Sequence, residues 1–148
     1  MLSVVERGGK VRSVHVTNVQ TKTVLPIVNE NIAKEAKVMT DDALQYHGKL
    51  GEYADHGVVN HSAKEYVRYE VGGVVHTNTI EGYFSIFKRG MKGVYQHCSE
   101  KHLHRYLAEF DFRYNHRIRL GINDKERTSH AIRGILGKRL TYRDSSAR

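Results

Sequence analysis

The stretch of sequence that decides the fold is HTNTIEGYFSIFKRGMKGVYQHCSEKHLHRYLAEFDFRYNHR, residues 76–117. Apolar side chains repeat in it at helical spacing, in two blocks. The first block is Ile80, Phe84, Phe87 and Met91, and the second is Leu103, Tyr106, Leu107, Phe110 and Tyr114. Gly90 and Gly93 lie between the blocks, and Ser99 is suited to cap the second. The pattern predicts two amphipathic helices that bury one face each.

Upstream of these helices the pattern changes to short apolar runs. Two β-branched runs, residues 4–6 and 11–16, flank Arg7-Gly8-Gly9-Lys10 and predict a hairpin. Thr23 is expected to cap a helix that carries Leu25, Val28 and Ile32 on one face, with Pro26 in its first turn. Residues 37–40 form a short strand that runs into Asp41-Asp42. The order hairpin, helix, strand predicts α/β layers.

The rest of the chain gives weaker signals. Residues 48–75 contain five glycines, and only Val58-Val59 resembles a strand. A last helix is expected at Thr128–Leu136, ending at Gly137. At 148 residues the chain fits one domain, and no run of 18 apolar residues suggests a membrane span. A single cysteine, Cys98, excludes an internal disulfide, so we expect a cytoplasmic protein without a secretory signal.

The net charge of +8 is unevenly distributed along the chain. Residues 1–75 hold nine Lys and Arg against nine Asp and Glu, so their charges cancel. The remainder holds 15 basic and seven acidic residues, which is the whole excess. A basic half beside a neutral half favours a polyanionic partner, most commonly nucleic acid, although a solvated surface explains it equally well.

Two acidic positions could carry chemistry. Asp41 follows a strand directly, and ligands usually bind at the carboxyl edge of an α/β sheet; the alternative is that it caps the turn Ala43–Tyr46. Glu81 and Lys88 are seven residues apart, on one helix face, where they could hold a metal ion and a DNA phosphate. The alternative is a capping box in which Glu81 reaches back towards Asn78.

Residues 76–117 closely resemble the C-terminal signature of ISXO-like insertion-sequence transposases, and HTNTIEG…KRG is the specific part. Further similar segments are VERGGKVR at 5–12, the Thr40-Asp41 strand end, VNHS at 59–62 and EYV at 65–67. The resemblance implies a ribonuclease-H-like α/β fold of the Asp-Asp-Glu class, with a mixed sheet and helices, in which three carboxylates bind two Mg²⁺ ions. It makes Asp41 the second acid, Glu81 the third and Lys88 the basic residue after it. Asn78 is a possible metal ligand if Glu81 serves only as a cap.

The chain departs from the family pattern at the first acid. No aspartate precedes Asp41, and Glu6, Glu30 and Glu35 do not fit the first strand. We therefore expect a transposase domain at 1–137 that lacks its first strand, with a polar tail at 138–148. An N-terminally truncated copy of this kind should not transfer strands alone, because two-metal chemistry needs the missing carboxylate. The rival hypothesis is a non-catalytic DNA-binding remnant.

The expected partner is DNA, both transposon ends and target, and the intact enzyme should be a nucleoid-associated homo-oligomer. The side chains expected to contact DNA are Lys88, Arg89, Lys92, Arg105, Arg113 and Arg117. A zinc site formed by Cys98 with its neighbouring histidines at 97, 102 and 104 is a weaker alternative, because His102 and His104 point to different helix faces.

Overall fold

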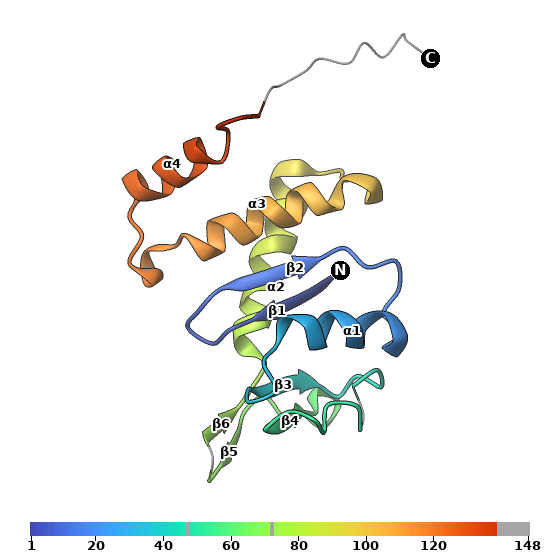
Figure 1. Ribbon diagram of the computed structural model, residues 1–148. Helices are drawn as coiled ribbons and strands as arrows, with labels where there is room; N and C mark the ends of the chain where they lie inside the picture. Colours follow the sequence, from blue (N-terminus) through green and yellow to red (C-terminus); the bar gives the residue numbers. More distant parts are fainter. Residues whose placement is uncertain (47, 72, 139–148) are drawn as a thin grey trace. The chain divides into compact units, whose positions relative to one another are not determined.

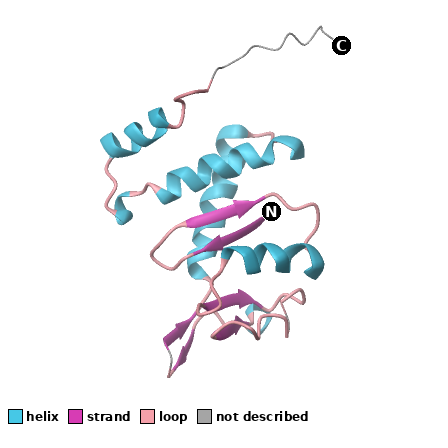
Figure 2. Cartoon of the chain, in the orientation of Figure 1, coloured by secondary structure: helices cyan, strands magenta, loops and turns pink. Residues whose placement is uncertain are grey.

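The computed structural model describes residues 1–46, 48–71 and 73–138 (Figure 1). Within these residues it is a mixed α/β structure of short strands and helices (Figure 2). By its internal contacts the chain divides into two compact units, residues 1–115 and 116–148, and each is described here by itself. The expected tail, 138–148, lies outside the described residues apart from Lys138.

The strands of the first unit form three separate two-stranded sheets among the described residues. Strands β1 (Leu2–Val5) and β2 (Val11–Val14) make the predicted antiparallel hairpin. Strands β3 (Lys37–Asp41) and β4 (Asp55–Val59) include the strands expected at residues 37–40 and 58–59, and they pair in parallel. Strands β5 (Arg68–Glu70) and β6 (Gly73–Val75) form a second hairpin, which the sequence did not predict. Each described sheet has two strands, so the ribonuclease-H-like mixed sheet expected from the sequence stays a prediction.

Three long helices complete this unit. They are α1 (Thr21–Asn31), α2 (Asn78–Gly90) and α3 (Leu103–Asn115). Short 3₁₀ segments occur at His61–Ala63 and Glu100–His102, and a π-helical segment, Met91–Tyr95, extends α2. In Figure 1, α2 passes behind the β1–β2 hairpin, and α3 lies along β2.

The larger core lies between the hairpin, α2 and α3. Its buried members are Val11, Tyr83, Phe87, Leu107 and Phe110. The apolar stripes predicted for both helices pack here, with Ile80, Phe84, Met91, Leu103, Tyr106 and Tyr114 partly buried around this centre. The predicted amphipathic helices are therefore confirmed. Tyr83, which is outside the predicted stripe, is only 2% exposed and is the largest fully buried side chain.

Helix α3 also binds the outer edge of β2 through side chains. The Asn115 side-chain oxygen accepts from Val11 N–H at 2.7 Å, and its Nδ2 donates to the Val11 carbonyl at 2.8 Å. Asp111 accepts from the Ser13 N–H at 2.6 Å, from the Ser13 hydroxyl at 2.7 Å and from the Tyr83 hydroxyl at 2.5 Å. These bonds satisfy backbone groups that an edge strand would otherwise leave open.

A second core lies between α1 and β3. Val24, Val28, Val38, Leu50 and Tyr53 are buried in it. The predicted stripe residues Leu25 and Ile32 pack at its margin, as does Leu2 of β1. This contact links the first hairpin to the β3–β4 pair by packing, since no strand of one sheet pairs with a strand of the other within the described ranges.

Two predicted helix caps of the first unit are wrong. Helix α1 begins at Thr21 after Gln20, because Asn18 accepts from the Gln20 N–H at 3.1 Å and from the Thr23 hydroxyl at 2.7 Å; Pro26 is therefore inside the helix. Helix α2 ends at Gly90, one of the two glycines expected between the helices, and the backbone continues as the π-helical segment until Gln96, which has a φ of 57°. Ser99 precedes a 3₁₀ turn and makes no side-chain cap.

The second unit contains one 3₁₀ turn, Ile118–Leu120, and helix α4, Asp124–Arg133, in its described part. The helix was expected to start at Thr128, and that boundary is also wrong. Asn123 accepts from the Glu126 N–H at 3.0 Å, and Glu126 accepts from the Asn123 N–H at 2.9 Å. This capping box fixes the start four residues earlier.

Candidate active site

The parallel pairing of β3 and β4 brings their carboxyl ends to one edge. Asp41 lies opposite Val59 in the register, so the residues that follow each strand emerge side by side. Asn60 Nδ2 donates to Asp42 Oδ2 at 3.1 Å across this edge. The acidic end of β3 is therefore held beside the Asn60-His61 segment, at the place where ligands bind α/β sheets.

Asn60 shapes the turn that follows β4. Its side-chain oxygen accepts from the Ala63 N–H at 3.0 Å, and its own N–H donates to Glu65 Oε2 at 3.0 Å. This bond is the largest factor that lowers the pKa of Glu65, and Arg68 adds to it. Lys64 ends the short helix with a φ of 58°. The turn presents His61 towards the start of α2.

His61 connects this edge to Glu81. Its Nε2 lies 3.1 Å from Glu81 Oε1 and 3.1 Å from Thr77 Oγ1. The Thr77 hydroxyl donates to the same carboxylate oxygen of Glu81. Thr77 is 6% exposed, whereas about half of the Glu81 side chain is exposed, at 48%. One oxygen of Glu81 is thus fixed by two neighbours, while the carboxylate stays open to solvent.

The two capping alternatives are not formed. The residue before α2 is Thr77, and Asn78 is its first residue, so Glu81 bonds to the Thr77 side chain and not to an Asn78 capping box. Ala43–Tyr46 is a turn closed by Tyr46 N–H and the Ala43 carbonyl at 3.0 Å, so neither aspartate caps a helix there. Burial raises the pKa of Tyr46, and the nearby charge of Asp41 raises it further.

The basic residues predicted to contact DNA lie on several elements. Lys88 and Arg89 are exposed in the last turn of α2, and Lys92 is exposed in the π-helical segment. Arg105 is exposed on α3. Arg113 pairs with Glu109 at 2.6 Å, and Arg117 belongs to the second unit.

A few residues beside the site were not singled out as functional from the sequence. Arg7, in the first hairpin's turn, donates to the Val74 carbonyl at 3.0 Å and contacts Met39 Sδ at 2.7 Å. It thereby joins the hairpin turn to β6 and β3. His76 Nδ1 is buried without a hydrogen-bond partner, and burial followed by the Arg7 charge lowers the His76 pKa. In the sequence, the only signal for Arg7 is its place in the segment VERGGKVR, which resembles the family. No sequence pattern predicts its contact with Val74, which is 67 residues away.

The β5–β6 hairpin is anchored by ion pairs near the site. Arg68 contacts Glu65 at 2.9 Å, Glu70 at 2.8 Å and the Val58 carbonyl at 3.0 Å. Lys37 of β3 pairs with Asp55 at 2.6 Å and Glu70 at 3.4 Å. The hydrogen bond from Arg68 lowers the pKa of Glu70, with a further contribution from Lys37. These groups are partly exposed, so they set geometry more than stability.

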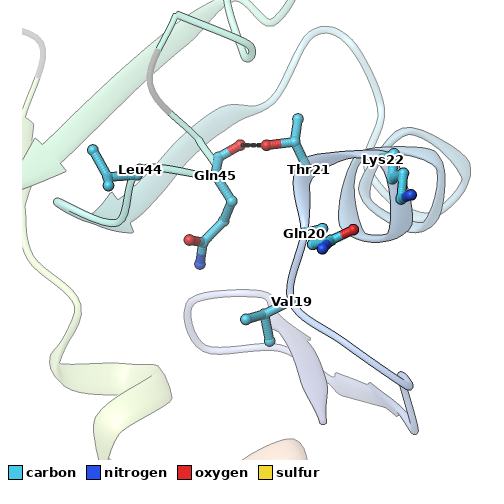
Figure 3. Close-up of a pocket in the computed structure, with 6 residues that line it drawn as sticks. All are labelled: Val19, Gln20, Thr21, Lys22, Leu44 and Gln45. Carbon is cyan, nitrogen blue, oxygen red and sulfur yellow. Dashed lines mark hydrogen bonds between the residues drawn. The ribbon is translucent and has the colours of Figure 1, made fainter.

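A shallow open depression of about 540 Å³ lies at the start of α1 (Figure 3). Val19, Gln20, Thr21, Lys22, Leu44 and Gln45 line it, and the Thr21 hydroxyl donates to the Gln45 carbonyl at 3.3 Å. Its lining includes one charged residue, Lys22, and no carboxylate. It is therefore not the place where the acidic residues gather.

Metal-binding groups of three or more His, Cys, Asp or Glu side chains do not occur among the described residues. Asp42 contacts this segment through Asn60, and Glu81 contacts it through His61. Cys98 Sγ contacts the Ser99 carbonyl at 3.4 Å, and His15 lies 3.4 Å from Glu100. In the described ranges, no helix has the length and apolar character of a membrane span.

These features define a mixed α/β domain with acidic residues at the shared end of two parallel strands and in the first turn of the following helix. The family model of the ISXO2-like transposase domain matches residues 1–115, and the chain belongs to that family. The resemblance seen in the sequence is thereby confirmed. Comparisons with curated proteins and with solved structures gave no match. The matched segment coincides with the first compact unit.

Proposed function

We propose that this transposase-family chain acts in DNA transposition through a ribonuclease-H-like site in which Asp41 and Glu81 are two of the acidic residues. The contact of His61 with Glu81 carries the proposal. It joins the helix bearing Glu81 to the residue two positions beyond Val59, the register partner of Asp41. This link supports a common site for Asp41 and Glu81, which are 40 positions apart in the sequence.

The donor chemistry fits Mg²⁺, but the number of ligands is incomplete. Carboxylate oxygens are the ligands that Mg²⁺ prefers, and Asp41 and Glu81 would hold it, with exposed Asn78 as a neutral alternative. Two such ions, if bound, would supply the activation of water and of a DNA 3′-hydroxyl for attack on phosphodiesters. No aspartate precedes Asp41, and the described residues contain no three-ligand group. We therefore propose that this chain alone does not complete the two-ion site.

Neighbouring residues orient Glu81 and the residue that follows Asp41. Thr77 and His61 hold one oxygen of Glu81, which leaves the second oxygen free for a ligand. Asn60 bonds to Asp42, the residue next to Asp41. Such partners of a ligating side chain typically contribute about 10–100-fold to metal affinity. Lys88 lies two turns along α2, about 10 Å from Glu81 along the axis, and is suited to contact a phosphate.

Metal binding tests the site. Mn²⁺ binding to the full chain would be followed by electron paramagnetic resonance for the wild type, Asp41→Asn and Glu81→Gln. Glu52→Gln is the control, because Glu52 is an exposed acid paired with Lys34 at 2.8 Å. We expect both site variants to lower the affinity by about tenfold or more and the control to leave it unchanged. Equal affinities in all four proteins would refute the assignment.

A non-catalytic DNA-binding protein is the second candidate function, and the missing three-ligand group among the described residues favours it. The test is incubation of the chain with duplexes carrying insertion-sequence ends, with Mg²⁺ and with Mn²⁺. Binding without cleavage in either metal supports the non-catalytic function. Cleavage that disappears in Asp41→Asn shows that this chain is an active enzyme by itself.

A further inference from the structure

Most of the chain's excess charge lies in the second unit. Residues 116–148 contain nine Lys and Arg and three Asp and Glu, a net charge of +6. Residues 1–115, the part that matches the family model, hold the other 15 basic and 13 acidic residues, a net charge of only +2. The positive charge is therefore concentrated outside the matched domain.

Helix α4 uses one face for contacts within its own unit. Arg127 donates to the His116 carbonyl at 2.9 Å and pairs with Asp124 at 3.1 Å. The His130 ring lies 4.9 Å from the His116 ring, centroid to centroid. At 100° per residue, Arg127 and His130 share this face. The opposite face is left for solvent or a partner.

A row with basic residues at both ends begins on that opposite face, at Lys125, and turns towards the side of the helix. Lys125, Ser129 and Arg133 follow one another at i, i+4 and i+8, so they form a ridge about 12 Å long, and all three are exposed. Lys138 and Arg119 are exposed as well. Within the described part of the chain, these basic side chains form no ion pair with a carboxylate. Their charge is available to an external anion.

We propose that the second unit is a binding module for the phosphate backbone of duplex DNA, with Lys125, Ser129 and Arg133 as its contact row. A duplex carries one negative charge per about 1.7 Å of its axis, so a 12 Å ridge faces several phosphates. Charge complementarity decides the occupant, because the unit has three times as many basic as acidic residues. The choice of DNA as the polyanion rests on the proposed function. The contact row on α4 is a separate site from the one at Asp41 and Glu81.

The test compares two triple variants that remove the same charge. Lys125→Gln/Arg133→Gln/Lys138→Gln alters the second unit, and Lys10→Gln/Lys22→Gln/Lys49→Gln alters exposed lysines of the first. Affinity of each full chain for a non-specific duplex would be measured over a range of salt concentrations. Each phosphate contact contributes about 0.9 to the slope of log K against log salt. We expect the first variant to lose up to about 2.7 of slope and the second to lose nothing.

A charge-conserving variant, Lys125→Arg/Arg133→Lys/Lys138→Arg, should keep the wild-type slope, which separates loss of charge from loss of folding. The proposal is overturned if the Gln variant of the second unit keeps the wild-type slope, or if both Gln triples lose the same amount. Sedimentation of the Gln variant of the second unit gives a further check. If this variant changes its oligomeric mass while its slope of log K against log salt is unchanged, the contact row binds protein, and the proposal is overturned. Failure here leaves the Mn²⁺ result at Asp41 and Glu81 intact, so the two proposals can fail separately.

Discussion

Replacement of Asn115 by alanine should destabilise the first unit, because it opens the outer edge of β2. The change removes the bond from Val11 N–H at 2.7 Å and the bond to the Val11 carbonyl at 2.8 Å. Val11 is only 3% exposed, so water has little access to the two groups left behind. A buried backbone group without a partner costs more than the net value of the bond it loses.

The magnitude follows from the two bonds. At about 0.5–1.5 kcal/mol each, their loss lowers the free energy of unfolding by about 1–3 kcal/mol. For a unit of this size the melting temperature should fall by roughly 4–12 °C. Asn115→Asp should be no more stable than Asn115→Ala. A carboxylate can accept from the Val11 N–H, but it repels the Val11 carbonyl oxygen.

Urea denaturation followed by circular dichroism at 222 nm measures this effect. The matched control is Asn31→Ala, since the Asn31 side chain makes a single bond to the Ile27 carbonyl of its own helix, at 2.7 Å. The control loses one bond but gains the better helix propensity of alanine, so we expect its stability to change by less than about 0.5 kcal/mol. A denaturation midpoint for Asn115→Ala that equals that of the control would refute the role of the edge contact.

Two further changes test the packing of α2. Gly90→Ala should lower stability by about 1–3 kcal/mol, because its Cβ would lie 2.9 Å from Phe110 Cε1 and closer still to Cζ, whereas Gly82→Ala, with no atom within 4 Å, should raise stability by about 0.4–1 kcal/mol. If the two variants melt alike, the Phe110 contact does not explain the glycine. Burial, followed by the hydrogen bond with Asp111, raises the pKa of Tyr83. The folded chain then retains a proton that the unfolded chain loses, so this stabilisation is complete below about pH 10 and declines above it. Tyr83→Phe should flatten the decline of the urea midpoint between pH 9 and 11, and an unchanged pH profile would contradict this assignment.

Helices and strands could be predicted from the sequence where apolar residues repeat at regular spacing within one short segment. The stripes around Phe87 and Phe110, the first hairpin and the strand ending at Asp41 were all found as expected. The β5–β6 hairpin was missed because its strands are three residues long and Tyr69 is exposed, so no alternation marks a buried face. Helix starts were missed where the residues that fix them lie upstream of the apolar positions, as Asn18 does before α1 and the N-cap Asn123 before α4.

At the candidate site, too, local features could be predicted from the sequence, whereas contacts between distant residues could not. The sequence placed Asp41 at a strand end and Glu81 in the first turn of a helix, and the structure has both there. It could not show that Val59 pairs with Asp41, because a parallel register depends on residues far apart in the chain. His61 and Thr77 as partners of Glu81 follow from that register, so their role was visible only in three dimensions.

The hydrogen bond between Val11 and Asn115 joins residues 104 positions apart. During synthesis on the ribosome, it can therefore form only long after Val11 has been added to the chain. At about 5–20 residues per second, roughly 5–20 s pass between synthesis of Val11 and synthesis of its partner. During that interval the first hairpin can form, but its β2 edge stays open to other chains. The β3–β4 pair closes over only 18 positions, from Lys37 to Asp55, and can form much earlier. The nascent chain should therefore be most vulnerable to misassembly at its first hairpin. This vulnerability ends when α3 has been synthesised and packs against β2.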